Sequence, residues 1–206
     1  MRDPSRKALV EWGVASEPLA GQPESGDLGV VFPFRGGVLV GAVDGLGHGD
    51  EAAAAAKAAA AVLRGQPDAP VTWLLRRCHE ALVETRGVVM SVASFSARHG
   101  TMEWIGVGNV EGILLRADAA ASSPREPLLL RGGVVGFNLP PLLASVIPVT
   151  RGDTLVLATD GVRSGFADRL GLAEPPQRLA DQILAQHAKR TDDALVMVAV
   201  FLGDPA

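Results

Sequence analysis

Apolar runs separated by glycine- and proline-containing turns are the main pattern of the chain, and they predict a protein rich in β-strands. Residues 8–16 and 28–43 contain such runs, broken by Pro33 and by a turn at Gly36-Gly37. Residues 88–116 hold three more, with the sequences "VVMSVASFSA", "TMEWIGVG" and "EGILLR". The runs "DTLVLATDG" and "ALVMVAVFL" predict two late strands. Residues 117–127 are small, polar and proline-containing, and they predict a loop.

Three segments are predicted to be helices. The first is alanine-rich, with Asp50 as its expected N-cap and its end at about Arg64. The second has Asp68 as its expected cap and carries apolar residues at the three-and-four spacing of one buried face. Those apolar residues are Val71, Leu74, Leu75, Cys78 and Leu82. The third helix opens at Pro175-Pro176, because proline is favoured in the first turn of a helix.

The order of these elements favours an α+β fold. Strands cluster in runs, with two adjacent helices early and one late, whereas a doubly wound parallel sheet requires a strict alternation of strand and helix. Mostly antiparallel sheets are therefore expected. No repeat, long linker or change of composition divides the chain, so residues 1–206 are expected to form a single domain.

Composition and charge narrow the possible functions. Hydrophobic residues make up 48% of the 206 residues and charged residues 20%, which is typical of a globular protein. The net charge of −4 argues against a nucleic-acid binder. Cys78 is the only cysteine, which suits a reducing compartment. The N-terminus has no apolar signal region, and the alanine-rich run is too short to cross a membrane, so a cytoplasmic protein without membrane contact is expected.

The stretch "VDGLGHG", in which Asp44 ends an apolar run, could be a phosphate cradle or part of a metal site. A dinucleotide-binding loop has the spacing G-x-G-x-x-G, and a second strand follows its helix. Here the glycines are Gly45, Gly47 and Gly49, and the helix is followed by another helix. No Gly-Lys-Ser/Thr sequence follows either. The nucleotide interpretation is therefore disfavoured.

Asp44 can instead be a metal ligand, since Mg²⁺ and Mn²⁺ prefer oxygen ligands. The Asp-Gly pair recurs as Asp160-Gly161 at the end of another apolar run, and Asp192-Asp193 lies directly before the last one. Aspartates at strand ends can converge on one edge of a sheet sandwich. Taken singly, each is better explained as a common turn or a solvated strand entry. Taken together, they favour a metal centre.

The contexts of these aspartates resemble those of a known family. The segments "SGDLGVV", "VDGLGHG", "GVGNVEG", "LVLATDGV" and "TDDALVMVAV", in this order, resemble the PPM-type, metal-dependent protein serine/threonine phosphatases of the SpoIIE-like branch. With "GGVVGFNLP", they are most similar to the RsbX-type feedback phosphatases of the bacterial stressosome. The resemblance covers about residues 10–202. It implies a four-layer α/β/β/α sandwich of two mainly antiparallel sheets flanked by helices, with a two-metal centre at one edge.

The resemblance also implies a role for each acidic position. Asp44 would bridge two Mn²⁺ or Mg²⁺ ions, and the carbonyl of Gly45 would bind one of them. Asp160 and Asp192 would hold the other ion. Asp27 would support a metal-bound water without binding the metal itself, and Asp193 is assigned a supporting role only.

Several positions depart from the wider family. Leu46 stands where many members have a histidine proposed to protonate the leaving group. His48 is the alternative general acid, although a lone loop histidine is more often a hydrogen-bonded structural residue. Residues 12–27 hold no match to the family's phosphate-binding arginine. Asn109 and Ser164 replace aspartates that hold a third ion in many relatives, so a weak or absent third site is expected.

The implied reaction is hydrolysis of phosphoserine or phosphothreonine by a water that two cations activate. No covalent phosphoenzyme is expected, because Glu84 and not arginine stands six residues after Cys78. By resemblance, the substrates are phosphorylated STAS-domain proteins of a stressosome, and the enzyme is a monomer. Two other classes stay open: a phosphoprotein-binding module that kept the fold and lost activity, and a hydrolase of small phosphate esters.

Overall fold

The computed structural model describes residues 8–118, 120–168, 170–171 and 174–203, which form two β-sheets and three helices. The strands of sheet A are β1 (Val10–Glu17), β6 (Glu111–Leu115), β7 (Arg125–Pro127), β10 (Thr154–Ala158) and β11 (Ala194–Phe201). The strands of sheet B are β2 (Asp27–Phe34), β3 (Gly37–Gly45), β4 (Val88–Ser96), β5 (Thr101–Val107), β8 (Leu130–Arg131) and β9 (Ser145–Pro148). The helices are α1 (Asp50–Gly65), α2 (Val71–Ala81) and α3 (Pro176–His187).

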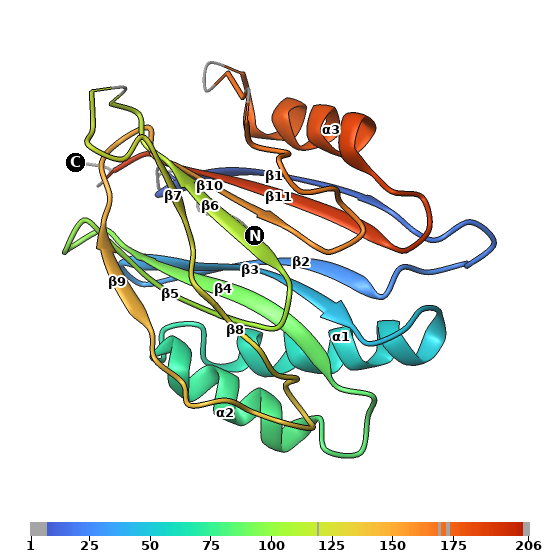
Figure 1. The fold of residues 1–206 in the computed structure, drawn as a ribbon. Coiled ribbons are helices and arrows are strands. Elements are labelled where there is room, and N and C mark those ends of the chain that lie inside the picture. The colour runs from blue at the N-terminus through green and yellow to red at the C-terminus, as the bar shows by residue number, and fades with distance from the viewer. Residues whose placement is uncertain (1–7, 119, 169, 172–173, 204–206) are drawn as a thin grey trace.

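The two sheets lie face to face between the helices (Figure 1). Sheet A has the strand order β1-β11-β10-β6-β7, and sheet B has the order β2-β3-β4-β5-β8, with β9 also paired to β5. All of these pairings are antiparallel except β5–β8. Helices α1 and α2 cover the outer face of sheet B, and α3 covers that of sheet A (Figure 1). The predicted α+β sandwich with α/β/β/α layers is confirmed.

Three apolar layers hold the sandwich together, one between the sheets and one under the helices on each side. Helix α1 contributes six buried alanines, whose small side chains let the helix lie close to sheet B. Cys78 of α2 belongs to the same layer, and burial raises the pKa of its thiol to about 12. The thiol is therefore protonated at neutral pH and packs as a core residue. No helix in the described parts of the chain is both long and apolar enough to cross a membrane.

The two predicted aspartate caps are wrong. The N-cap of α1 is Gly49, with φ 76°, and Asp50 is the first residue of the helix. The positive φ favours glycine, while Asp50 in the first turn still interacts favourably with the helix dipole. The N-cap of α2 is Pro70, so Asp68 lies before the helix and does not cap it. The third helix does begin at Pro175-Pro176, with Pro175 as the N-cap.

Sheet edges account for the other differences from the prediction. The predicted break at Pro33 is absent, because β2 is the outer strand of sheet B and an edge strand tolerates proline. Part of the predicted loop 117–127 forms β7, which pairs with the end of β6. A half-buried ion pair between Arg116, the residue after β6, and Glu126 of β7 joins the two segments at that point.

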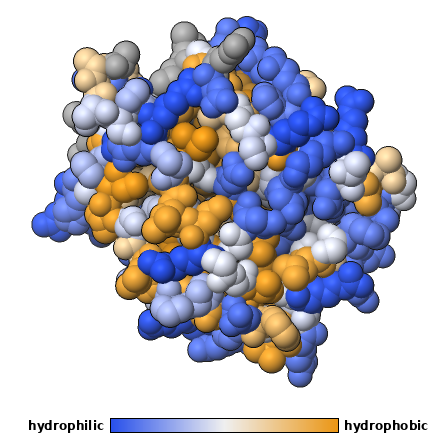
Figure 2. All heavy atoms as spheres, in the orientation of Figure 1, coloured by the Kyte–Doolittle hydropathy of each residue, from blue (hydrophilic) through white to orange (hydrophobic). Residues whose placement is uncertain are grey.

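The segment 128–148 contributes short edge strands and most of the large exposed apolar side chains of the described chain. Figure 2 shows hydrophobic side chains gathered over the lower part of the face on which β8 and β9 lie in Figure 1. The exposed residues in this segment are Leu129, Phe137, Leu143 and Val146. Strands as short as β8 and β9 carry too little periodicity to be predicted from sequence.

Candidate functional site

A glycine directly after an aspartate brings a second backbone segment close to each of two strand ends. A Cβ on Gly45 would lie 2.1 Å from the carbonyl oxygen of Ala52, and a Cβ on Gly161 would lie 1.9 Å from that of Asp193. Only glycine allows backbones to approach this closely. As a result, α1 begins directly beside Asp44, and the segment that enters β11 lies against the end of β10.

Asp27 and Asp44 lie opposite each other at one end of sheet B. They are register partners in the β2–β3 pair, so their side chains are cross-strand neighbours. Asp27 is buried, and its Oδ2 accepts a hydrogen bond of 2.7 Å from the hydroxyl of Thr159. Oγ1 of the same hydroxyl accepts a hydrogen bond of 2.8 Å from the backbone N–H of Leu195. Thr159 thus connects sheet A to the carboxylate of Asp27 in sheet B.

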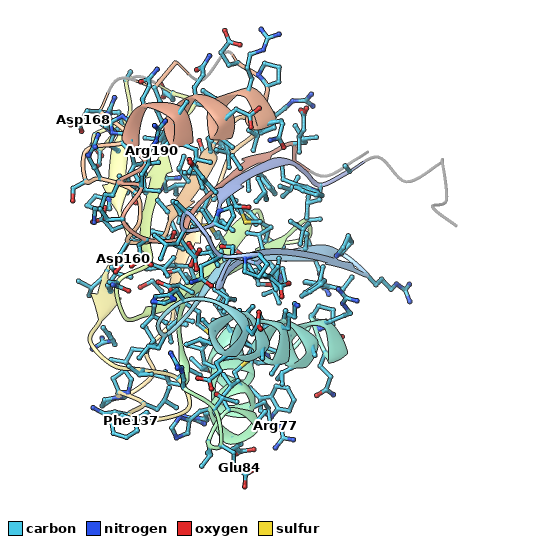
Figure 3. The ribbon with its side chains drawn as sticks, turned by 90° about the vertical axis from the view of Figure 1, so that its right-hand side faces the viewer. Arg77, Glu84, Phe137, Asp160, Asp168 and Arg190 are labelled. Carbon is cyan, nitrogen blue, oxygen red and sulfur yellow. The ribbon has the colours of Figure 1, made fainter. Side chains whose placement is uncertain are left out.

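Asp160 and Asp192 approach this pair from sheet A. Oδ2 of Asp160 accepts a hydrogen bond of 2.8 Å from Nδ2 of Asn109, and the ammonium of Lys189 donates to the Asp160 carbonyl oxygen. Oδ1 of Asp192 accepts the N–H of Asp193 at 2.9 Å. Both side chains are half-buried, and each has one carboxylate oxygen without a hydrogen bond to the described residues. Figure 3 labels Asp160 on this edge.

Asp193 has a different environment from its neighbour Asp192. Its side chain is buried, and its two oxygens accept the backbone N–H groups of Leu19 at 2.7 Å and Gly26 at 2.8 Å. These bonds fasten the loop between β1 and β2 to the start of β11. Both oxygens of Asp193 are thus engaged by the backbone, and its supporting role at the metal site stays a prediction.

The clustered carboxylates oppose one another's ionisation. Burial, and then the charges of four neighbouring aspartates, raise the pKa of Asp44 to about 9. Burial also raises the pKa of Asp27 to about 7, against the lowering effect of its hydrogen bond from Thr159. Since each repulsion would be relieved by a nearby cation, the electrostatics of the site favour cation binding.

The side chains of the site are of the type that binds a hard divalent cation, although their oxygens do not point to one common position in this structure. As they lie, no three Asp, Glu, His or Cys side chains of the described residues form a group that could hold one metal ion. The site nevertheless presents carboxylate oxygens, the ligands that Mg²⁺ and Mn²⁺ prefer. Lys189 contacts the carbonyl of Asp160 and not a carboxylate, so it does not compensate the cluster as an ion pair would. Binding of an ion would require side-chain rotations, for which Asp160 and Asp192 each have a free oxygen.

The structure brings most of the predicted site residues to one edge of the sheet sandwich, whereas His48 lies in the exposed loop before α1 and contacts none of the aspartates by a hydrogen bond among the described residues. His48 is exposed in the loop before α1, and its Nδ1 lies 3.3 Å from Nε2 of Gln22. This is the environment of a hydrogen-bonded loop residue, and a catalytic role for His48 stays a prediction. Ser164 is exposed, whereas Asn109 contacts Asp160 directly.

Sequence reasoning missed two residues of the site. Thr159 precedes Asp160 in the "TDG" segment, and Lys189 stands just before the acidic pair that enters β11. Nothing in the local pattern distinguishes them, because their contacts join residues that are far apart in the sequence. Proximity to a candidate ligand was the one available signal.

Comparisons with known proteins agree with this fold. The family model of Stage II sporulation protein E (SpoIIE) matches residues 35–201. A solved structure described as "The bacterial stressosome: a modular system that has been adapted to control secondary messenger signaling" is 28% identical, with a TM-score of 0.83 over 92% of this chain and 98% of that chain. A sequence comparison with curated proteins finds no match.

Two more distant structures share the fold. RsbX in complex with magnesium is 18% identical, with a TM-score of 0.82 over 95% of this chain and 96% of that one. A structure of the PP2C phosphatase domain and a regulatory fragment of SpoIIE from Bacillus subtilis is 16% identical, with a TM-score of 0.74 over 96% and 64% of the two chains. At these identities the likeness shows the fold alone.

Proposed function

Since the chain belongs to the Stage II sporulation protein E (SpoIIE) family, we propose that it is a metal-dependent protein serine/threonine phosphatase. The observation that carries this proposal is the meeting of acidic residues from both sheets at one edge of the sandwich. Asp27 and Asp44 come from sheet B, and Asp160 and Asp192 flank β10 and β11 of sheet A. The charges of these residues act on one another, as the raised pKa of Asp44 indicates.

In this proposal Asp44, the Gly45 carbonyl, Asp160 and Asp192 hold two Mn²⁺ or Mg²⁺ ions. When bound, such ions make a water acidic enough to attack phosphorus near neutral pH and offset the charge of the phosphate oxygens. Asp27 has no ligand role here. Its carboxylate, oriented by Thr159 at 2.7 Å, is placed to accept a proton from a water at the site.

The raised pKa values predict that cation affinity depends steeply on pH. A cation binds the ionised form of Asp44, whose pKa is raised to about 9, and its charge also favours ionised Asp27, whose pKa is raised to about 7. Below these values binding must expel protons, so affinity should rise by about tenfold per pH unit for each proton released, and level off above about pH 9. Calorimetric Mn²⁺ titrations between pH 6 and pH 9 in buffers of different ionisation enthalpy would measure the affinity for Mn²⁺ and the number of protons released on binding. A pH-independent affinity without proton release would contradict the predicted ligand set.

A weak or absent third ion is proposed from the replacement of two carboxylates by Asn109 and Ser164. Asn109→Asp would put a negative charge beside Asp160 Oδ2, where the amide now lies at 2.8 Å. With Ser164→Asp, this change should add a weak third Mn²⁺ site, because a carboxylate binds a hard cation better than an amide or a hydroxyl. Anomalous diffraction from Mn²⁺-soaked crystals of both proteins would show it. A well-occupied third ion in the wild type, or an unchanged metal dependence in a folded double variant, would refute the prediction.

For the substrate, we propose phosphoserine or phosphothreonine on STAS-domain proteins of a stressosome-type complex, as in an RsbX-like enzyme. One support is the 28% identity to a solved structure whose description names the bacterial stressosome. The other is the fold that this chain shares with RsbX in complex with magnesium. We also propose that the enzyme acts as a cytoplasmic monomer. The single cysteine is consistent with a reducing compartment.

The test compares two substrates in the presence and absence of Mn²⁺. The protein should release phosphate from phosphorylated STAS-domain proteins of the same genome and from a generic aryl phosphate, in both cases only with Mn²⁺. Fast turnover of the aryl phosphate alone would favour the small-ester hydrolase. Binding of a phosphoprotein without any turnover would favour the binding module.

A further inference from the structure

Two hollows in the surface lie side by side between the end of β1 and the segment that follows α3. The larger, about 590 Å³, is lined by residues 14–17 of β1, three residues of α3 and Arg190. The smaller, about 120 Å³, is lined by Glu17, Pro18, Ala20, Ala188, Arg190, Asp192 and Ala194. Glu17 and Arg190 line both. We call the pair the β1–α3 groove; it extends from the proposed metal ligand Asp192 along the edge of sheet A.

One wall of this groove is an open strand edge. β1 is the outer strand of sheet A, and α3 covers its middle: a Cβ on Gly13 would lie 2.2 Å from the backbone of Gln177. Oε1 of Gln177 accepts a hydrogen bond of 3.1 Å from the N–H of Val14, and Nε2 of Gln177 donates one of 2.9 Å to the C=O of Val14. Backbone groups in an antiparallel strand face alternate sides, so the N–H and C=O of Ser16 also point away from β11. Ser16 is exposed and lines the larger hollow.

Arg190 provides a positive charge where the two hollows meet. It is exposed, it has no ion pair with the described residues, and it is the one described residue other than glycine with a positive φ, 61°. Figure 3 shows Arg190 beside α3, above Asp160. A guanidinium binds carboxylate and phosphate oxygens through paired N–H groups. At this position it can bind an anionic group next to the metal edge.

We propose that the β1–α3 groove binds an extended segment of the protein substrate that flanks the phosphorylated residue. The segment adds to β1 through hydrogen bonds with the N–H and C=O of Ser16, and an acidic side chain of the segment binds Arg190. This inference rests on the proposed phosphatase function and names how the same site selects a protein over a small ester.

An extended peptide fits the groove better than other ligands. Because Gln177 satisfies Val14 and Pro18 has no N–H, the free part of the strand edge is the N–H and C=O of Ser16. One residue of an extended chain can satisfy this donor and this acceptor together, in the mode known as β-strand addition. The groove begins at Asp192, so a residue held at the proposed metal centre would leave its neighbours in the chain at the mouth of the groove. Glu17 and Asp181 on the walls would repel a segment that is acidic throughout and favour one with a single acidic residue at Arg190.

Two matched pairs of variants test the proposal. Ser16→Pro removes the N–H donor on an edge strand, where proline is tolerated, and Ser16→Ala keeps it. Arg190→Asn removes the charge with a residue that accepts a positive φ, and Arg98→Asn makes the same change in the exposed β4–β5 turn. The substrates are a short phosphothreonine peptide with an acidic neighbour, the same peptide with that neighbour neutral, and an aryl phosphate, all with Mn²⁺. Thermal unfolding checks that each variant is folded.

Ser16→Pro and Arg190→Asn should each raise KM for the acidic phosphopeptide by about tenfold, while Ser16→Ala and Arg98→Asn leave it unchanged. The effect of Arg190→Asn should disappear with the neutral peptide, and no variant should change aryl phosphate kinetics. Equal KM values for Ser16→Pro and Ser16→Ala would overturn the strand addition. An equal rise for aryl phosphate in Arg190→Asn would place that side chain at the phosphate and overturn its role in the groove.

Failure of the phosphatase proposal can be told apart from failure of the groove. If the wild type turns over neither substrate, fluorescence anisotropy of the labelled phosphopeptide in EDTA still measures binding. Weaker binding by Ser16→Pro than by Ser16→Ala would then support the groove in a protein without activity. Identical binding by the two variants would contradict it.

Discussion

Asp44→Asn is expected to lower Mn²⁺-dependent turnover by roughly 10²–10³-fold, because the amide keeps the shape of the side chain but lacks the charge that would hold two cations together. The same change should raise the stability of the metal-free protein at pH 8. In the folded state the pKa of Asp44 is raised to about 9, whereas an unfolded aspartate ionises at about 3.9. The fold therefore keeps a proton that the unfolded chain has lost, and the metal-free wild type loses stability as the pH rises from about 4 to about 9. An asparagine avoids this loss.

Phosphate release would measure turnover, calorimetric titration would measure the affinity for Mn²⁺, and thermal unfolding in EDTA at several pH values would measure stability. The stability advantage of Asp44→Asn should grow with pH and shrink when Mn²⁺ is added, since the cation stabilises only the wild type strongly. Asp50→Asn, an exposed aspartate in the first turn of α1, is the matched control and should change neither activity nor metal affinity. Near-normal turnover of Asp44→Asn would refute the two-metal assignment.

Substitution by alanine should have different effects on stability at Asp192 and at Asp193, the two residues that precede β11. Asp193→Ala should destabilise the metal-free protein by about 3–5 kcal/mol, because it leaves the N–H groups of Leu19 and Gly26 without their charged acceptor in a buried site. Asp192→Ala should change stability by less than about 1 kcal/mol, since its side chain is half-buried and accepts one local hydrogen bond. Urea unfolding at pH 6 in EDTA would measure both.

Activity completes the comparison of the two aspartates. Asp192→Ala should lose Mn²⁺-dependent phosphate release while it remains folded, as expected of a metal ligand. Asp193→Asn retains an acceptor for one of the two N–H groups and should recover part of the stability lost in Asp193→Ala. A stable Asp193→Ala protein without activity would exchange the roles of the two residues.

Much of the candidate site could be predicted from local sequence because the signals are short-range. An apolar run that ends in Asp-Gly places a carboxylate at a strand end next to a residue that permits close backbone approach, and this is what Gly45 and Gly161 do. The buried face of α2 followed from its three-and-four spacing, and proline marked the start of α3. The caps of α1 and α2 were missed because glycine and proline took the positions expected for aspartate.

The sequence by itself determined the β-rich α+β class, the strand ends that carry aspartates, and the buried helix faces, since each depends on residues within a few positions of one another. Only the tertiary structure decided which contacts each aspartate makes. The register of β2 on β3 sets Asp27 opposite Asp44, and packing of the sheets brings the hydroxyl of Thr159 to Asp27. The fold of the β1–β2 loop binds both oxygens of Asp193 to backbone N–H groups, whereas Asp192 keeps one oxygen without a hydrogen bond to the described residues. The hydrogen bonds of Thr159 and Asp193 join residues more than a hundred positions apart, and their energies depend on burial and mutual charge, which a linear pattern does not contain.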